Sequence, residues 1–353
     1  MNLPPEPDPG FLVGTWTFTD PQVPLDTSLH VVRLQSDPPV AVVSDTAKAV
    51  YYGTVEPGGD TVLLLHNDID RSGMSRHRLG PDGHLVEEGR WSSGGIGGSY
   101  ITFDPTGRHF VVANAHTGWA VFENGPVPRL VASLHHSGSG PHPRQSKSHP
   151  HRAIFSPSGT WIYATDMGTD EVLAFPFDSS SSTVGPKVVA FRCEPGSGPR
   201  HVLAGHGLLY LLNELGNTLV VLQPQPDGTL IERQLLSTLP DGFSEFSHTA
   251  HLDLSRDGRH LYVSNRGHDS VMVVDVDADG LLANPRWTPS GGHWPWFFTF
   301  TSQGRMLVAN NLSDIVAVFD IDGDGDLHPV HQVTVPRPVF VAEWPTRSST
   351  SNP

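Results

Sequence analysis

Charged and imidazole side chains recur at the ends of short apolar segments in this chain. Glu214 and Arg266 come directly after such segments, whereas His151 and Arg200 come directly before them. A carboxylate or an imidazole can act as a base or an acid toward a bound molecule. A guanidinium forms paired, charge-assisted hydrogen bonds with a carboxylate, a phosphate or an oxyanion. These residue types therefore suit proton transfer on a small molecule that carries or develops negative charge.

A repeated unit positions these side chains. It consists of an apolar strand, a turn with Gly, a second apolar strand and then Asn or Asp, and it returns about every 50 residues. Clear copies end at Asn114, Asp166, Asn213, Asn265 and Asn310, and a weaker copy ends at Asn67. The 36 Gly and 32 Pro are spread along the chain, as the turns of an all-β protein require. Short strands repeated at this spacing predict a β-propeller.

The first strand of each predicted four-stranded blade can be placed from the apolar pattern. These strands are expected near residues 50–57, 99–105, 151–157, 200–206, 249–255, 296–302 and 338–344. The last of them has no following strands, while residues 11–45 supply three strands without a first one. We therefore predict that the N- and C-terminal segments complete one blade together and close the ring. One domain over residues 1–353 is expected, with loose termini at 1–10 and 346–353.

Strand direction divides the predicted loops between two faces. The short turns DPTG, SPSG and SRDG share one face. The other face receives the loops that carry the unusual polar residues, and channel mouths of this kind are common binding sites. The residues expected there are His149, His151, Arg200, His201, Asn114, Asp166, Glu214 and Arg266.

The composition restricts location and partners. A formal net charge of −15 argues against a nucleic-acid partner, although a local cationic pocket can still bind an anion. The single Cys193 excludes an intrachain disulfide, and no apolar run is long enough to cross a membrane. The N-terminal segment lacks the features of a signal peptide. We expect a cytoplasmic protein with no membrane partner, and the composition leaves its oligomeric state open.

The phrases SHPHRAIFSPSG, GSGPRHV, LLNELGN and YVSNRGHDS resemble those of the propeller lactonase family, from residue 13 to about residue 344. This family includes bacterial 6-phosphogluconolactonases and the fungal carboxy-cis,cis-muconate cyclase. The resemblance implies a seven-bladed propeller and a catalytic set of His151, Arg200, Glu214 and Arg266. Opening a lactone needs a base that activates water and donors for the developing oxyanion, which these types provide.

The chain also departs from the family pattern beside the expected site. Trp296 stands where relatives often have Arg, and His251 stands where many have Glu. Trp294 and Trp296 could stack on a sugar or lactone ring, or could be ordinary packing. The residues expected to bind substrate are therefore His149, His201, Asn114, Asp166, His251, Trp294 and Trp296.

Several of these residues also have structural interpretations. Glu214 and Arg266 could form a simple ion pair, and Asn or Asp at strand ends commonly fixes a turn. His149 and His151 face the same way on an extended segment and could be half of a metal site. The Asp-rich segments at 275–280 and 320–325 resemble the start of a calcium loop but lack its final Glu, which favours hairpin turns.

The sequence thus predicts a lactonase that needs neither metal nor cofactor and prefers an anionic lactone, with 6-phosphogluconolactone as the leading substrate. A carboxy-muconate cyclase is the alternative enzyme. A non-catalytic binding propeller is the alternative of another class. Whether Glu214 or His151 is the base stays open at this point.

Overall fold

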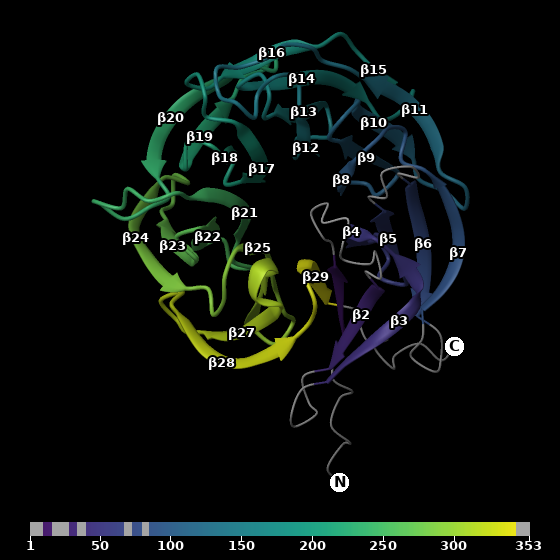
Figure 1. The fold of residues 1–353 in the computed structure, drawn as a ribbon. Coiled ribbons are helices and arrows are strands. Elements are labelled where there is room, and N and C mark those ends of the chain that lie inside the picture. Colours follow the sequence, from purple (N-terminus) through teal and green to yellow (C-terminus); the bar gives the residue numbers. More distant parts are fainter. Residues whose placement is uncertain (1–9, 16–27, 34–39, 67–72, 80–84, 344–353) are drawn as a thin grey trace.

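The computed structural model describes residues 10–15, 28–33, 40–66, 73–79 and 85–343. Within them 29 strands form seven sheets, which surround a common centre as the blades of a propeller (Figure 1). The predicted seven-bladed, all-β architecture is confirmed. The only helix in these residues is the short 3-10 turn η1 (Asn311–Ser313), so no helix there is long and apolar enough to cross a membrane.

The blades follow one another along the chain. The first three contain β4 (Val50–Val55), β5 (Thr61–His66), β6 (Gly73–Leu79) and β7 (Leu85–Ser92); β8 (Gly98–Phe103), β9 (His109–Asn114), β10 (Gly118–Glu123) and β11 (Arg129–Leu134); and β12 (Pro150–Phe155), β13 (Trp161–Asp166), β14 (Glu171–Asp178), β15 (Thr183–Val184) and β16 (Val188–Arg192). In the last of these, β15 and β16 both pair with β14, so this blade has five strands instead of the predicted four.

The remaining four blades each have four strands. They contain β17 (Pro199–Gly205), β18 (Leu208–Asn213), β19 (Thr218–Pro224) and β20 (Leu230–Ser237); β21 (His248–Leu254), β22 (His260–Arg266), β23 (Ser270–Val276) and β24 (Leu282–Pro289); β25 (Pro295–Phe300), β26 (Arg305–Asn310), β27 (Ile315–Ile321) and β28 (Leu327–Thr334); and β29 (Pro338–Glu343), β1 (Phe11–Thr15), β2 (Ser28–Arg33) and β3 (Val40–Lys48).

The last blade closes the ring as predicted. Strand β29 pairs antiparallel with β1, with Phe11 opposite Glu343 and Gly14 opposite Phe340. A Cβ on Gly14 would lie 2.5 Å from the carbonyl oxygen of Val50, so only glycine fits where this blade meets the next one. The expected loose termini at 1–10 and 346–353 fall almost wholly outside the described residues, and a single domain over 1–353 stays a prediction.

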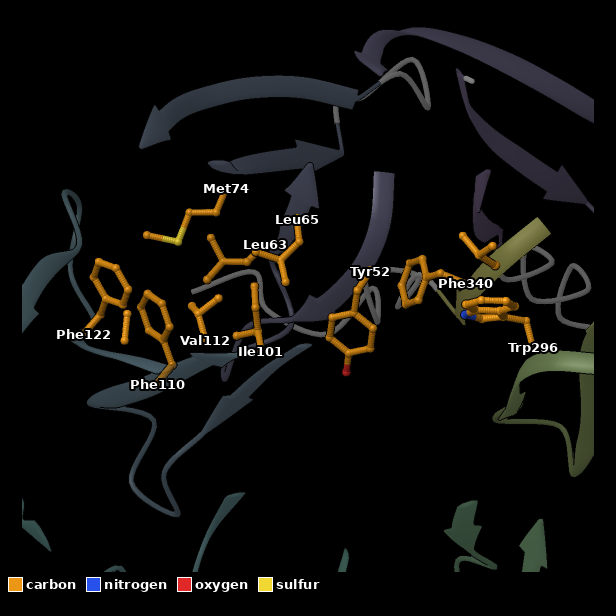
Figure 2. Close-up of a cluster of buried hydrophobic side chains, with 12 residues drawn as sticks. Tyr52, Leu63, Leu65, Met74, Ile101, Phe110, Val112, Phe122, Trp296 and Phe340 are labelled. Atoms are coloured by element: carbon orange, nitrogen blue, oxygen red, sulfur yellow. The ribbon is translucent and has the colours of Figure 1, made fainter. Parts of the chain in front are cut away.

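Apolar side chains fill the space between neighbouring blades. One cluster joins β4, β5 and β6 to β8, β9 and β10, and Figure 2 shows it running from Phe110 and Phe122 to Tyr52, Phe340 and Trp296. Polar contacts between blades recur as well. The hydroxyl of Tyr210 donates to the carbonyl of Gly280 at 2.9 Å, and the hydroxyl of Tyr262 donates to that of Gly325 at 2.7 Å.

The Asp-rich segments are hairpin turns, as the sequence favoured. In the turn before β24, Oδ1 of Asp277 accepts hydrogen bonds from the backbone of Asp279 and Leu281. Asp322 does the same before β28, where its Oδ1 accepts from Asp324 and Asp326. These carboxylates therefore hold the backbone of their own turns.

The first strands β4, β8, β12, β17, β21, β25 and β29 lie nearest the centre of the ring (Figure 1). Six of them have a register break at the second residue, and β21 has one slightly later. The residues inserted by these six breaks are Tyr51, Ser99, His151, Arg200, Trp296 and Val339. A β-bulge redirects the inserted side chain, so the same local irregularity recurs at the same place in successive blades.

Candidate active site

The four predicted catalytic residues lie at equivalent ends of neighbouring strands. His151 and Arg200 occupy the bulges of β12 and β17, Glu214 directly follows β18, and Arg266 ends β22. His151 and Arg200 lie in strands, as the expected ranges 151–157 and 200–206 imply, while Arg266 is the last residue of β22 and not part of the loop that follows. A bulge turns the side chains of His151 and Arg200 out of the sheet without ending the strand.

The carboxylate of Glu214 is the centre of this site. Its Oε2 lies 2.7 Å from Nε of Arg200, and its Oε1 lies 3.0 Å from Nη2 of Arg266. Two contacts were not predicted: Nη1 of Arg144 lies 2.5 Å from Oε1, and Nδ1 of His248 lies 3.5 Å from it. Glu214 and Arg266 thus do form an ion pair, but within a group of three guanidiniums around one carboxylate.

The charges of this group oppose the effect of burial. Burial alone would raise the pKa of the Glu214 carboxyl, but Arg266, a hydrogen bond from His248, and the charges of Arg200 and Arg144 hold it well below its usual value. Burial lowers the pKa of Arg266 to about 10, which still leaves it charged at neutral pH. Three guanidiniums against one carboxylate leave an excess of two positive charges. Such a group attracts an anion.

His151 is the second titratable group of the site. It is buried, and burial together with the charge of Arg200 lowers its pKa well below the usual 6.5, while Glu214 acts in the opposite direction. Its Nδ1 has no hydrogen-bond partner in the described part of the chain. Both Glu214 and His151 are unprotonated at pH 7, but arginines hold the Glu214 oxygens, whereas the unpartnered Nδ1 of His151 is available to take a proton.

Aromatic side chains line the arginines. The guanidinium of Arg266 lies over the ring of Trp296 at 4.7 Å and over that of Trp294 at 5.5 Å. Phe246, which the sequence analysis missed, is 64% exposed and lies parallel to Trp294 at 6.1 Å. Trp296 is also part of the apolar cluster in Figure 2, so its packing and its contact with Arg266 coexist.

Trp294 has an unusual backbone. Its φ is 66°, in the left-handed region that bulky residues rarely adopt. The carboxylate of Asp269 holds this conformation, because its Oδ1 accepts the backbone N–H of Trp294 at 2.8 Å. Strain of this kind concentrates at functional sites, where the surrounding structure maintains it.

His149, His201 and His251, which were also expected to bind substrate, lie near the site at different positions in or just before the inner strands. The ring of His149 is 6.3 Å from that of His151, and burial lowers the pKa of His149 to about 4. His201 and His251 lie 4.7 Å apart, one residue or more beyond the bulges. No group of three or more His, Cys, Asp or Glu suited to a metal occurs among the residues the structure describes.

Asn114 and Asp166 have roles in the loops. Asn114 accepts from Oγ of Ser93 at 2.8 Å and donates to its carbonyl at 3.0 Å. Asp166 accepts the backbone N–H groups of His149 and Gly168 at 2.7 and 2.9 Å. Both side chains therefore fix the loops, and Asp166 holds the backbone of His149. Their contact with a substrate stays a prediction.

The long segment between β11 and β12 is a loop, and its second half reaches the site. Oε1 of Gln145 accepts from the backbone of His142, while its Nε2 donates to Met167 and Asp170. Gln145 is fully buried, so it anchors the loop at the residue next to Arg144. Because the loop has no periodic pattern, only a structure could place Arg144 against Glu214.

Comparison with known proteins agrees with this geometry. Residues 27–343 match the family described as "Lactonase, 7-bladed beta-propeller". The chain belongs to this family. It is therefore a lactonase-type hydrolase, and the comparison leaves its substrate open.

Named relatives of this lactonase include a 6-phosphogluconolactonase of Bacillus subtilis, 33% identical over 255 residues, which are 69% of this chain and 72% of that one. An uncharacterized protein of Lactococcus lactis subsp. cremoris is 33% identical over 62% of this chain and 66% of its own length. Among solved structures, the periplasmic gluconolactonase of Pseudomonas aeruginosa superposes with a TM-score of 0.83 at 26% identity, covering 95% of this chain and 98% of that one.

Proposed function

We propose that this lactonase hydrolyses an anionic sugar lactone, with 6-phosphogluconolactone as the leading substrate. The observation that carries the proposal is the excess of two positive charges around Glu214. A phosphate or carboxylate on the substrate would balance this charge, whereas a neutral lactone would leave it uncompensated. The B. subtilis relative named 6-phosphogluconolactonase supports the same choice.

In the proposed reaction His151 is the base. Its neutral imidazole takes a proton from water, and the resulting hydroxide adds to the lactone carbonyl carbon. Arg200 and Arg266 stabilise the oxyanion that forms, because each has five N–H donors and spends only some of them on Glu214 and backbone carbonyls. The bond to the ring oxygen then breaks, and the His151 imidazolium returns the proton to that oxygen. The product is the open-chain hydroxy acid.

Glu214 is a positioning residue in this proposal. Its two oxygens hold Arg200 and Arg266 from opposite sides, which fixes both guanidiniums toward the reacting carbonyl. The same oxygens also contact Arg144, so they are engaged by guanidiniums and are not available to take a proton from water. Trp294, Trp296 and Phe246 form an apolar wall on which a lactone ring could stack.

The test compares kcat/KM for 6-phosphogluconolactone and for gluconolactone at low and at high ionic strength. The phosphorylated lactone should be preferred by about tenfold or more at low salt, and the preference should shrink as salt screens the arginines. A ratio near one would exclude the phosphosugar while leaving a lactonase. Inactivity on both lactones would direct the next assay to carboxy-muconates, and inactivity there would favour a binding propeller.

We further propose that the reaction needs no cofactor and takes place in the cytoplasm, without a nucleic-acid or membrane partner. Cys193 is buried and unpaired with another cysteine, which suits a reducing compartment. The periplasmic P. aeruginosa neighbour marks the alternative. Cell fractionation with an antibody to the native chain tests the location.

A further inference from the structure

A second ring of side chains lies one position beyond the bulges along the inner strands. Its members follow the bulge residues directly, or lie at the matching place in β21, and they are Tyr52, Tyr100, Arg152, His201, His251, Phe297 and Phe340. The mechanism proposed above uses none of them. The ring therefore needs a separate explanation.

These side chains contact one another across the centre of the ring of blades. The guanidinium of Arg152 lies over the ring of Tyr100 at 3.8 Å, and Tyr100 stacks on Tyr52 at 4.0 Å. Tyr100 also meets His201 edge-on at 5.4 Å, and His201 lies 4.7 Å from His251. Figure 2 shows the hydroxyl of Tyr52 pointing away from the apolar cluster behind it. Five blades thus contribute to one polar layer.

Three side chains of this layer are buried and have polar atoms without partners among the described residues. Arg152 is 8% exposed, His201 1% and His251 3%. Nε and Nη1 of Arg152, Nε2 of His201 and Nδ1 of His251 have no hydrogen-bond partner in the described ranges. Native proteins satisfy nearly all buried polar groups with protein, water or a bound ion. Several unsatisfied groups in one layer therefore mark a place for water or a bound ion, and the charge of Arg152 favours an anion.

In the described part of the chain, Arg152 has no close ion-pair partner: no Asp or Glu there forms an ion pair with it within 4.0 Å. Asp253, two residues after His251, interacts with it at longer range: burial raises the pKa of Asp253 to about 6, and the charge of Arg152 lowers it. A close ion pair would instead hold that pKa below its ordinary value.

We propose that Arg152, with His201 and His251, binds a small oxyanion at the centre of the propeller, separate from the Glu214 site. The planar guanidinium presents paired N–H donors that match a carboxylate, phosphate or sulfate. Each neutral imidazole can add one donor. The Arg152 guanidinium is buried with no carboxylate of the described residues within 4.0 Å, and a bound oxyanion would supply the close counter-charge that it lacks. The oxyanion is either a free inorganic ion or the charged group of a bound substrate.

Selenate, a sulfate analogue that scatters anomalously, is the probe. Crystals soaked in selenate should show a peak within hydrogen-bond distance of the Arg152 guanidinium, and Arg152→Met should lose it. Arg144→Met should retain it, since Arg144 belongs to the Glu214 site. A wild-type crystal with selenate only beside Arg144 and Arg266 would overturn the proposal.

Calorimetric titration with sulfate tests the same site in solution. Arg152→Met should weaken binding by about tenfold or more. Asp253→Asn should tighten it, because the variant removes a negative charge near the anion; this variant also keeps the test decisive should Arg152→Met fail to fold. An unchanged or weaker affinity in Asp253→Asn would contradict an anion at Arg152. Arg259→Met, at an exposed arginine paired with Asp257, is the control and should bind sulfate normally.

Inhibition kinetics then identify the source of the oxyanion. Sulfate that competes with 6-phosphogluconolactone but not with gluconolactone, and that loses this competition in Arg152→Met, would place the substrate's own phosphate at Arg152. Sulfate that competes with neither would define a site for a free ion. Both results support the oxyanion site, whose existence is decided by the selenate peak and the sulfate titration independently of lactonase activity.

Discussion

Replacing Glu214 with Gln tests the interpretation of the site most directly, because it removes one charge and keeps the shape. The change leaves Arg144, Arg200 and Arg266 without their common carboxylate. Breaking a buried ion pair by removing one partner costs about 3–5 kcal/mol. With an unfolding entropy of about 2.1 cal/mol/K per residue, a chain of 353 residues should lose about 4–7 °C in Tm.

The stability difference should depend on pH with a defined sign. The folded-state pKa of Glu214 is lowered, so its stabilising effect is present above its unfolded pKa of about 4.3 and is lost as pH falls toward the folded-state value. The Tm gap between the wild type and Glu214→Gln should therefore be constant near pH 7 and narrow below about pH 4. Glu232→Gln, at an exposed carboxylate on β20, should show neither effect.

The dependence of kcat/KM on pH distinguishes a positioning role of Glu214 from proton transfer by His151. Glu214→Gln should lower kcat/KM by about two to four orders of magnitude, because the arginines lose their fixed orientation and His151 becomes a weaker base. Activity requires neutral His151, so the wild-type rate should fall only as pH drops through a value well below 6.5. That acid limb should persist in Glu214→Gln and disappear in His151→Gln. A limb that disappears in Glu214→Gln instead would make the carboxylate the base and refute this reasoning.

The remaining predictions concern substrate binding by Arg266, backbone strain at Trp294, closure of the ring by β29 and the need for a metal. Arg266→Ala should raise KM for an anionic lactone more than for a neutral one, as steady-state assays with both would show, since a charge-assisted hydrogen bond is lost. Trp294→Gly should be more stable than Trp294→Ala by about 1 kcal/mol in denaturant titrations, because only glycine adopts a φ of 66° without strain; equal stabilities would contradict the strain. Deleting residues 338–353 should expose the edge of β1 and cause aggregation measurable by light scattering, whereas a monodisperse product would argue against closure by β29. Activity should survive EDTA, and its loss would revive a metal at His149 and His151.

The architecture was predictable because each blade repeats the same pattern and the chain has one incomplete blade at each end. The predicted first strands start within about two residues of the observed ones, for instance residues 151–157 against Pro150–Phe155. The division of the outer edge of this blade into two short strands, β15 and β16, was not predicted. Gly185 and Pro186 separate the two, and each pairs with β14. Such a detail depends on packing against β14, which a repeat pattern does not encode.

The candidate site was predictable only where a residue stands at a strand end. Glu214 and Arg266 follow the repeated second strands, so their meeting with Arg200 could be anticipated from topology. Arg144 lies in a loop with no repeat, and nothing in the sequence places it. Arg152 looked like an ordinary strand residue, because its unsatisfied guanidinium becomes visible only when its neighbours are known.

The recurrent bulge connects the fold to the chemistry. In a regular strand, neighbouring side chains point to opposite faces, so the second and third residues of an inner strand could not both approach the axis. One inserted residue removes this alternation. It lets His151 and Arg152 in β12, and Arg200 and His201 in β17, serve two successive layers. The outer layer holds the carboxylate and arginines suited to lactone opening, and the inner layer holds the unpaired Arg152. A propeller of regular strands with the same residues would have only one of these layers.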